Sequence, residues 1–143
     1  MPHRNWRFRH SEFIPKRHNS ESILQEMVVR WLDQRNILYV ASLMGVNLGA
    51  RVGAIRKRMG CRAGVPDLLI LEARGKYHGM ALELKVAGGK ITGEQKAFKK
   101  ELETRGYYAV IMPPKLEVGE VFAWAIKDIE YYLKSPNLRM KGE

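Results

Sequence analysis

The chain has little of three things that often decide a protein's class: cysteine, acidic residues and long apolar runs. Cys61 is the one cysteine among 143 residues, which excludes an intrachain disulfide framework and a zinc site built from several cysteines. The longest uncharged run, residues 36–50, is too short and too rich in glycine to span a bilayer. Residues 1–20 carry arginine, lysine and histidine where a secretory signal would be apolar. We therefore expect a soluble cytoplasmic protein that is not secreted.

Acidic residues are clearly outnumbered. The chain has 25 Lys and Arg against 15 Asp and Glu, which gives a net charge of +10 and a pI of about 9.9. A positive excess of this size indicates a polyanionic partner, and nucleic acid is favoured over a membrane surface. The length fits one domain with a modest core, so oligomerisation is a fair expectation.

The positive charge gathers in two places. In residues 1–20 the basic side chains are interleaved with Trp6, Phe8 and Phe13, which suits phosphate contact and base stacking but is also typical of a solvated tail. The second cluster belongs to a short predicted helix, has no acid nearby, and could equally be a solvated helix face. The first cluster contains Arg4, Arg7, Arg9, Lys16 and Arg17, and the second contains Arg51, Arg56, Lys57, Arg58 and Arg62. The second cluster together with Lys90 is our candidate nucleic-acid-binding set.

Hydrophobic periodicity predicts eight elements in the order α, β, α, β, β, α, β, α. This order predicts an α/β fold with a central mixed sheet flanked by helices, in which two strands form a hairpin and a helix crosses over to the last strand. Helices are predicted over residues 20–36, 50–59, 93–105 and 118–133; strands over 37–43, 68–71, 80–86 and 107–112; and turns at 47–49 and around 75.

Three of these elements carry burial predictions. The apolar run 68–71 is typical of a strand that is buried on both faces. In the helix over 93–105 we expect Ala97, Phe98 and Leu102 on the inner side, with Glu101 as a further candidate. In the last helix the apolar stripe is expected in the core or at a dimer contact; it contains Phe122, Trp124, Ile126 and Ile129.

Two carboxylates and a lysine fall where two predicted strands meet. Asp67 opens one strand, and Glu83 and Lys85 lie on the same side of the next, about 7 Å apart. In a hairpin Asp67 can lie beside Glu83, and two converging carboxylates make a hard-oxygen site suited to Mg²⁺ or Mn²⁺. A lysine there can orient or help deprotonate a metal-bound water and offset phosphate charge. Glu-x-Lys alone is also common on solvent-facing strands.

The motifs around these residues resemble a known nuclease superfamily. Their order and spacing are similar to those of the PD-(D/E)xK nucleases, and most closely to the VRR-NUC branch in its compact stand-alone form from phages and bacteria. The resemblance covers residues 20–112 and implies a restriction-endonuclease-like core, with a basic arm over 1–19, a nuclease domain over 20–135 and a C-terminal tail over 136–143. It is carried by Gly64-Val65-Pro66-Asp67, Glu83-Leu84-Lys85 and Gln95, together with Glu21 and Gln25 on the first helix and the turn at Asn47-x-Gly49.

The resemblance implies a role for each of these positions. Asp67 and Glu83 would hold the divalent metal with the backbone carbonyl of Leu84, and Lys85 would serve the attacking water. Glu21 matches the family's helical acid, which assists the metal or the water.

Two of these positions have open alternatives. Glu26 competes with Glu21, and an acid near a helix N-terminus is favoured by the helix dipole in any case. Gln95 matches a glutamine placed near Lys85 or a phosphate, but it also stands at capping-box spacing from Thr92, and both jobs could coexist.

Charge, motifs and resemblance together predict a Mg²⁺-dependent DNA endonuclease, with Mn²⁺ as a substitute, in a bacterial cell or a phage-infected host. The branch resembles dimeric Holliday-junction resolvases, which implies a homodimer that acts on branched DNA and has no membrane partner. Two alternatives stay open: a non-catalytic nucleic-acid-binding protein that keeps the fold, and a nicking or restriction-type nuclease.

Overall fold

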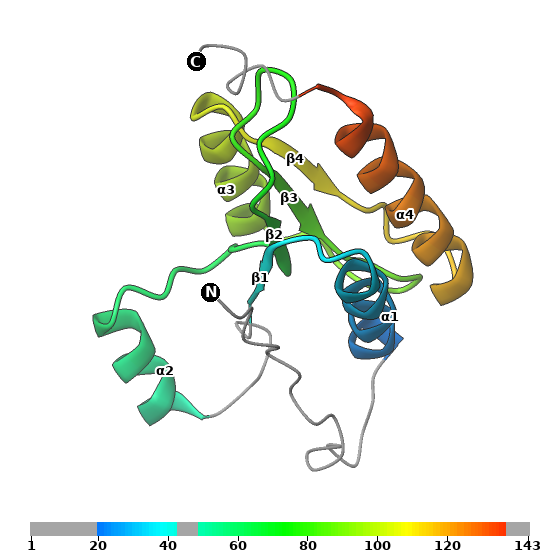
Figure 1. Cartoon of the computed structure of the whole chain (residues 1–143). Helices are drawn as coiled ribbons and strands as arrows, with labels where there is room; N and C mark the ends of the chain where they lie inside the picture. The colour runs from blue at the N-terminus through cyan, green and yellow to red at the C-terminus, as the bar shows by residue number, and fades with distance from the viewer. Residues whose placement is uncertain (1–19, 43–48, 137–143) are drawn as a thin grey trace, which may run out of the picture.

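The computed structural model describes residues 20–42 and 49–136. Within these ranges the helices and strands follow the predicted order (Figure 1). The first nineteen residues, residues 43–48 and the last seven lie outside the described residues, and so does most of the turn predicted at 47–49. The helices are α1 (Ser20–Gln34), α2 (Ala50–Arg58), α3 (Gly93–Thr104) and α4 (Val118–Lys134); the strands are β1 (Tyr39–Ala41), β2 (Leu68–Ile70), β3 (Met80–Glu83) and β4 (Tyr108–Ile111).

The strands form one mixed sheet in the order β1-β2-β3-β4. The β2 and β3 strands pair antiparallel, with Leu68 opposite Leu82, and β1 pairs antiparallel with β2. After β3, helix α3 crosses over to β4, which runs parallel to β3 with Glu83 opposite Ile111. The predicted hairpin, crossover and α/β architecture are therefore confirmed.

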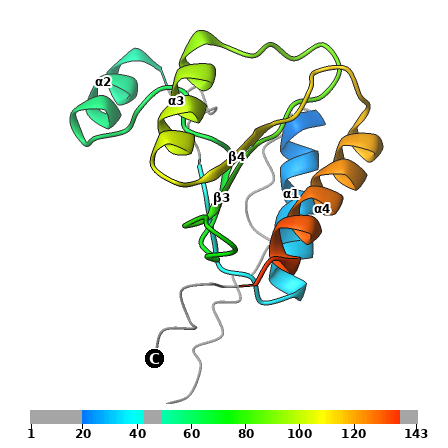
Figure 2. The ribbon, with the colours of Figure 1, turned by 90° about the horizontal axis from the view of Figure 1, so that it is seen from above.

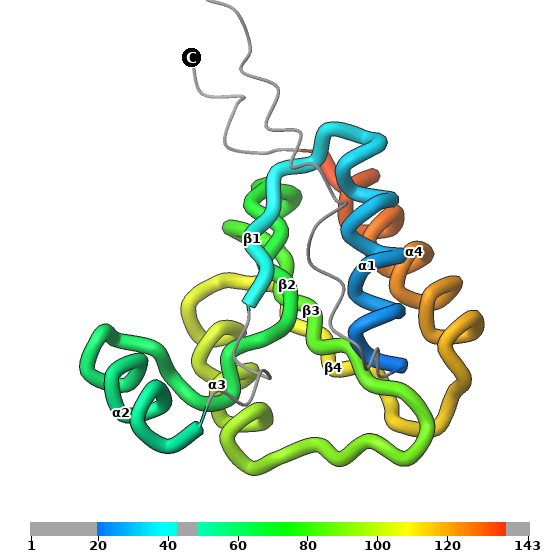
Figure 3. Tube along the Cα trace, turned by 90° about the horizontal axis from the view of Figure 1, so that it is seen from below, coloured from blue at the N-terminus to red at the C-terminus, as the bar shows by residue number. Residues whose placement is uncertain are grey.

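The helices cover the two faces of the sheet unequally. Helices α1 and α4 pack against each other over one face, and α3 packs against β4 on the opposite face (Figure 2). Helix α2 lies on the α3 side, away from α1 and α4, and buries none of its residues (Figure 3). The β1–β2 half of the α3 face consequently keeps exposed apolar side chains.

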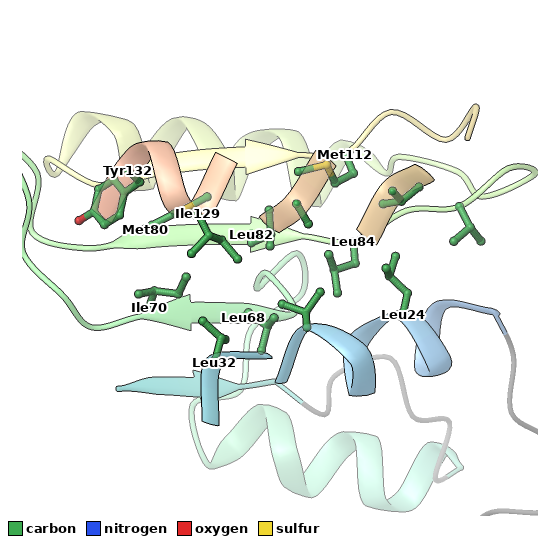
Figure 4. Packing of buried hydrophobic residues seen from close by; sticks show 14 residues of the cluster. Leu24, Leu32, Leu68, Ile70, Met80, Leu82, Leu84, Met112, Ile129 and Tyr132 are labelled. Atoms are coloured by element: carbon green, nitrogen blue, oxygen red, sulfur yellow. The ribbon is translucent and has the colours of Figure 1, made fainter. Parts of the chain in front are cut away.

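The core lies between the sheet and the α1–α4 layer (Figure 4). Side chains alternate between the faces of a strand, so every second residue of β2 and β3 enters this layer. Burial of such apolar surface is the main favourable contribution to folding. The fully buried larger side chains are Leu24, Val28, Leu32, Leu68, Ile70, Met80, Leu82, Leu84, Met112, Val121 and Ile129.

The expectation that residues 68–71 are buried on both faces is wrong. Leu68 and Ile70 are buried, but Leu69 is only partly buried and Leu71 is 45% exposed. The reason is that α3 packs against β4 and leaves the β1–β2 half of its face uncovered. In this chain a continuous apolar run therefore predicts the strand correctly, although only one face of that strand is covered by helices.

Several strands are shorter than predicted. The ladder of β3 ends at Glu83, although the chain stays buried through Val86, and β1 ends at Ala41.

The inner side of α3 also differs from the prediction: Phe98 is partly buried, but Ala97 is exposed. Glu101 is exposed as well and pairs with Arg105 one turn further on. In α4, Ile129 is in the core, Phe122 and Ile126 are partly buried, and Trp124 is exposed.

None of the helices in the described part of the chain is long and apolar enough to cross a membrane.

Truncation of a core leucine should destabilise the fold far more than truncation of a surface leucine. Leu82 is fully buried, so Leu82→Ala should lower the free energy of unfolding by about 2–5 kcal/mol through lost burial and a residual cavity. Leu38 is exposed, and Leu38→Ala should change it by no more than about 0.5 kcal/mol. Urea unfolding of both variants measures the difference, and similar losses would contradict the assigned core.

Candidate active site

The two predicted carboxylates meet because of the sheet register. Continuing the pairing of Leu68 with Leu82 by one residue places Asp67 opposite Glu83. On the other side of Asp67, its backbone carbonyl accepts a hydrogen bond of 2.8 Å from the N–H of Ser42. These positions alternate with the core leucines, so their side chains belong to the α3 face of the sheet.

Asp67 is a desolvated carboxylate beside a second one. Its Oδ2 accepts a hydrogen bond of 2.7 Å from the backbone N–H of Leu84. Burial, followed by the negative charge of Glu83, raises the pKa of Asp67 to about 7, and the bond from Leu84 and the charge of Lys85 offset this only in part. A free carboxyl group has a pKa near 3.8, so the site strongly resists ionisation when no cation is bound.

Glu83 and Lys85 form a buried ion pair. Among the described residues they are the buried charged side chains, 4% and 7% exposed. The Nζ of Lys85 lies 2.9 Å from Oε1 of Glu83. Burial raises the pKa of Glu83 even though the bond and charge of Lys85 oppose it. For Lys85, burial lowers the pKa, but the bond to Glu83 and the charges of Glu83, Glu21 and Asp67 outweigh it, so the net shift is upward and Lys85 keeps its proton.

Gln95 joins the first turn of α3 to this pair. Its backbone N–H donates to the hydroxyl of Thr92 (3.2 Å), and its Oε1 accepts from the backbone N–H of Thr92 (2.9 Å), which completes a capping box. Its Nε2 donates to Oε1 of Glu83 at 2.5 Å. One carboxamide therefore both caps the helix and bonds Glu83, whereas the sequence placed it at a helix cap or near Lys85 or a phosphate. The Thr-x-x-Gln spacing predicts the cap at Thr92, but it carries no signal for the link from this cap to Glu83.

Gly64 lets the loop before Asp67 pack on the same helix turn. Its φ is +81°, in the left-handed region that favours glycine. A Cβ at this position would overlap the backbone carbonyl of Glu94 and lie 2.9 Å from the backbone nitrogen of Gln95. The Gly-Val-Pro-Asp loop and the start of α3 are thus held together at the carboxylates.

Glu21 approaches the site from the N-terminal turn of α1. A Cβ at Gly89 would lie 3.0 Å from Oε1 of Glu21 and 3.5 Å from Cδ of Lys85, so both side chains border Gly89. The charge of Glu21 also contributes to the raised pKa of Asp67, Glu83 and Lys85. Of the two acids that the sequence left in competition, Glu21 therefore lies toward the site, while Glu26 is exposed.

The oxygen ligands at this site suit a hard cation, but the number of acidic side chains that can reach it is small. No group of three or more His, Cys, Asp or Glu side chains within residues 20–42 and 49–136 is placed to hold a metal ion. The two carboxylates that lie opposite each other are Asp67 and Glu83, and Leu84 follows Glu83 in the chain and bonds Asp67 through its N–H. Two adjacent carboxylates whose pKa values are both raised offer oxygen ligands and favour a cation, which fits Mg²⁺ or Mn²⁺.

The predicted nucleic-acid-binding residues belong to α2 and to two loops. Arg51, Arg56, Lys57 and Arg58 belong to α2, which has no acid in its first turn and buries no residue. Arg62 follows the helix and is exposed. Lys90 is exposed on the loop between Lys85 and α3. Most of these basic side chains therefore belong to α2, and the acids lie at the end of the sheet.

The fold and the paired carboxylates define a nuclease-type α/β domain, and comparison with known proteins agrees. Residues 5–113 match the family model of the VRR-NUC domain. A solved structure of a VRR_NUC domain protein is similar at a TM-score of 0.64 and 29% identity, over 85% of this chain and 93% of that one. No curated protein matches. The chain belongs to the VRR-NUC domain family, which confirms the resemblance and implies DNA as its partner.

Replacing Asp67 with its neutral isostere should stabilise the metal-free protein at alkaline pH. The folded-state pKa of Asp67, about 7, lies above the value of 3.8 for a free carboxyl group. Its contribution to stability is therefore present at low pH and lost as the pH rises through 7. In EDTA, Asp67→Asn should raise the free energy of unfolding by about 1–3 kcal/mol at pH 8, and by less at pH 5.

The measurement is thermal or urea unfolding at both pH values. Glu130→Gln, at an exposed position of α4, controls for the loss of one negative charge. A destabilised Asp67→Asn at pH 8, or a gain matched by the control, would contradict the assignment.

Proposed function

We propose that the protein is a divalent-metal-dependent DNA endonuclease that cuts branched DNA as a homodimer. The observation that carries the proposal is the carboxylate pair of partly buried Asp67 and buried Glu83, which lie opposite each other where β2 begins and β3 ends, with Lys85 and Gln95 bonded to Glu83. Paired carboxylates with a lysine at a sheet end are suited to phosphodiester hydrolysis, and family membership supports nuclease chemistry.

Asp67, Glu83 and the backbone carbonyl of Leu84 would hold the metal, Mg²⁺ or Mn²⁺, with Glu21 at the edge of the site. When bound, such a metal polarises the scissile phosphate and lowers the pKa of a bound water. The carboxylates favour this binding because a cation relieves the mutual repulsion and desolvation that raise their pKa values.

The other side chains at the site would orient Glu83 and offset the negative charge of the phosphate. Lys85, whose pKa is raised by Glu83, would act as a hydrogen-bond donor and a positive charge for water or phosphate. Gln95 and Lys85 both donate to Oε1 of Glu83, which fixes the direction in which that carboxylate points. The basic residues of α2, with Arg62 and Lys90, would bind backbone phosphates without reading sequence.

The proposed dimer follows from the number of sites. The described residues of one chain form one such carboxylate pair, so paired cuts on two strands would require two copies. On the outer side of α4, Trp124 and Tyr131 are exposed aromatic side chains and are candidates for the contact. A cytoplasmic location belongs to the same proposal.

Removal of either carboxylate should abolish cleavage. With Mg²⁺ and a four-way junction as substrate, Asp67→Ala and Glu83→Ala should each lower the cleavage rate about 1,000-fold or more, because the metal loses a ligand. Glu130→Ala, an exposed acid on α4, should stay within about twofold of wild type. Gel mapping of the products measures the rates, and symmetric paired cuts are expected from a dimer.

Three outcomes of that experiment would reject parts of the proposal. No cleavage by wild type, together with tight metal-independent binding, would favour the non-catalytic alternative. Equal cleavage by Asp67→Ala would remove the assigned site. Preferential cutting of one linear duplex sequence over the junction would favour a restriction-type or nicking nuclease.

Thr92 should act as a positioning residue through Gln95. Thr92→Ala removes the hydroxyl that anchors the first turn of α3, so the carboxamide on Glu83 loses its fixed orientation. We expect Mn²⁺ affinity and kcat/KM to fall about tenfold, as for other residues that orient metal ligands. Thr92→Ser keeps the hydroxyl and should retain wild-type values.

The matched control is the capping box of α4, where Glu117 caps the helix with Glu120. Glu117→Ala should cost about 1 kcal/mol of stability, like Thr92→Ala, and leave Mn²⁺ affinity unchanged. Calorimetric titration of both variants separates the two roles; equal Mn²⁺ affinities in the two variants would show that Thr92 is only a helix cap.

A further inference from the structure

A cavity of about 450 Å³ lies between the end of α2 and the β1–β2 half of the sheet. Its floor is apolar: Val40 and Leu69 face each other in the sheet register, and Val65 and Pro66 form a wall. The region of α2 and the loop after it contributes Arg56, Gly60, Cys61 and Arg62, and the end of β1 contributes Ala41 and Ser42.

The cavity adjoins the candidate active site through two of its lining residues. Ser42 donates its backbone N–H to the carbonyl of Asp67, so it is the neighbour of Asp67 on the next strand. Leu69 is two residues after Asp67 and belongs to the same sheet face. Neighbouring strands lie about 4.8 Å apart, and alternate residues along a strand about 7 Å apart. The cavity therefore begins about one residue's width from the carboxylates, on their face of the sheet.

The chemistry of the cavity combines an apolar floor with a cationic border. Val40 is 52% exposed on that face. Arg62 lines the cavity, and the sequence of α2 beside it contains four basic residues and no acid. Guanidinium groups suit phosphate, and an apolar surface suits the face of a base. A volume of this size lies within the range for small-ligand pockets.

We infer that this cavity takes one unstacked nucleotide of the DNA strand beside the phosphate that is cut. The inference rests on the proposed function for its substrate and adds a reason for preferring branched DNA. Unstacking a base from a continuous duplex costs a few kcal/mol, and the cost is least where the base is already unpaired. Because the floor offers apolar contact, the cavity selects for an unpaired nucleotide rather than for a sequence.

The first test compares three duplexes of one sequence: fully paired, with one unpaired adenine, and with an abasic residue in place of that adenine. Binding is measured by fluorescence anisotropy with Ca²⁺ instead of Mg²⁺. Wild type should bind the unpaired adenine about tenfold more tightly than the abasic duplex, because the two share a backbone and differ in the base. Equal affinities for these two would overturn the inference.

The second test blocks the cavity. Cys61 is exposed, lines the cavity and is the single cysteine of the chain, so N-ethylmaleimide alkylates the folded protein at one position. Alkylation should reduce the preference for adenine over the abasic residue to within about twofold. An alkylated protein that keeps the tenfold preference would also overturn the inference.

The matched control moves the label along the same sheet face. Leu38 is exposed and outside the cavity lining, so alkylated Leu38→Cys in a Cys61→Ala background should keep the tenfold preference. Equal loss in both labelled proteins would mean that the label acts nonspecifically. Unpaired adenine should also slow alkylation of Cys61 more than the abasic duplex does. Circular dichroism melting verifies that each labelled protein is folded.

The binding assay needs no cleavage, so the two proposals can fail separately. Base-dependent binding together with unaltered cleavage by Asp67→Ala would leave the cavity assignment and reject the proposed catalytic site. Metal-dependent cleavage without base-dependent binding would support the proposed catalytic site and reject the cavity assignment. If alkylation of Cys61 instead dissociated a dimer in the absence of DNA, with no effect on base preference, a second copy would be the occupant and the inference would be wrong.

Discussion

The antiparallel register of β2 and β3 is the constraint on which the rest of the site depends. It places Asp67 opposite Glu83 at the end of the sheet, while the same alternation sends Leu68 and Leu82 into the core. A shift of one residue would exchange the two sets, so the hydrophobic effect that fills the core also fixes the position of the acids. The stability of the core and the geometry of the carboxylates are therefore two results of one pairing.

The acids stay in place through a balance of unfavourable and favourable terms. Burial and like charge raise the pKa of Asp67 and Glu83, and the ion pair with Lys85 and the bonds from Leu84 and Gln95 reduce but do not remove this penalty. The carboxylate pair therefore lowers the stability of the fold, which is common at active sites. The bonds to Thr92 and the packing of Gly64 on α3 hold the arrangement against its own repulsion.

Much of this was accessible from the sequence, and the exceptions have a common physical cause. The order of elements, the hairpin and the proximity of Asp67, Glu83 and Lys85 follow from local periodicity and spacing, which strongly constrain a small sheet. The exposure of Leu71 and Ala97 could not be predicted, because it depends on how far α3 extends over the sheet, and that is set by tertiary packing. The contact from Gln95 to Glu83 was also inaccessible: capping-box spacing identifies the bonds within the helix, but not the direction in which the remaining amide hydrogens point.

Helix α2 stands between α1 and Asp67 in the chain, yet it buries no side chain. Its residues are consequently free of the packing constraints that limit substitution in a core. In the course of evolution the charge and shape of this helix could change while the residues from Gly64 to Gln95, which carry most of the site, stay the same. Substrate preference and catalytic chemistry can therefore diverge independently in a domain of this size, and a graft that exchanges α2 alone would be a natural route to altered specificity.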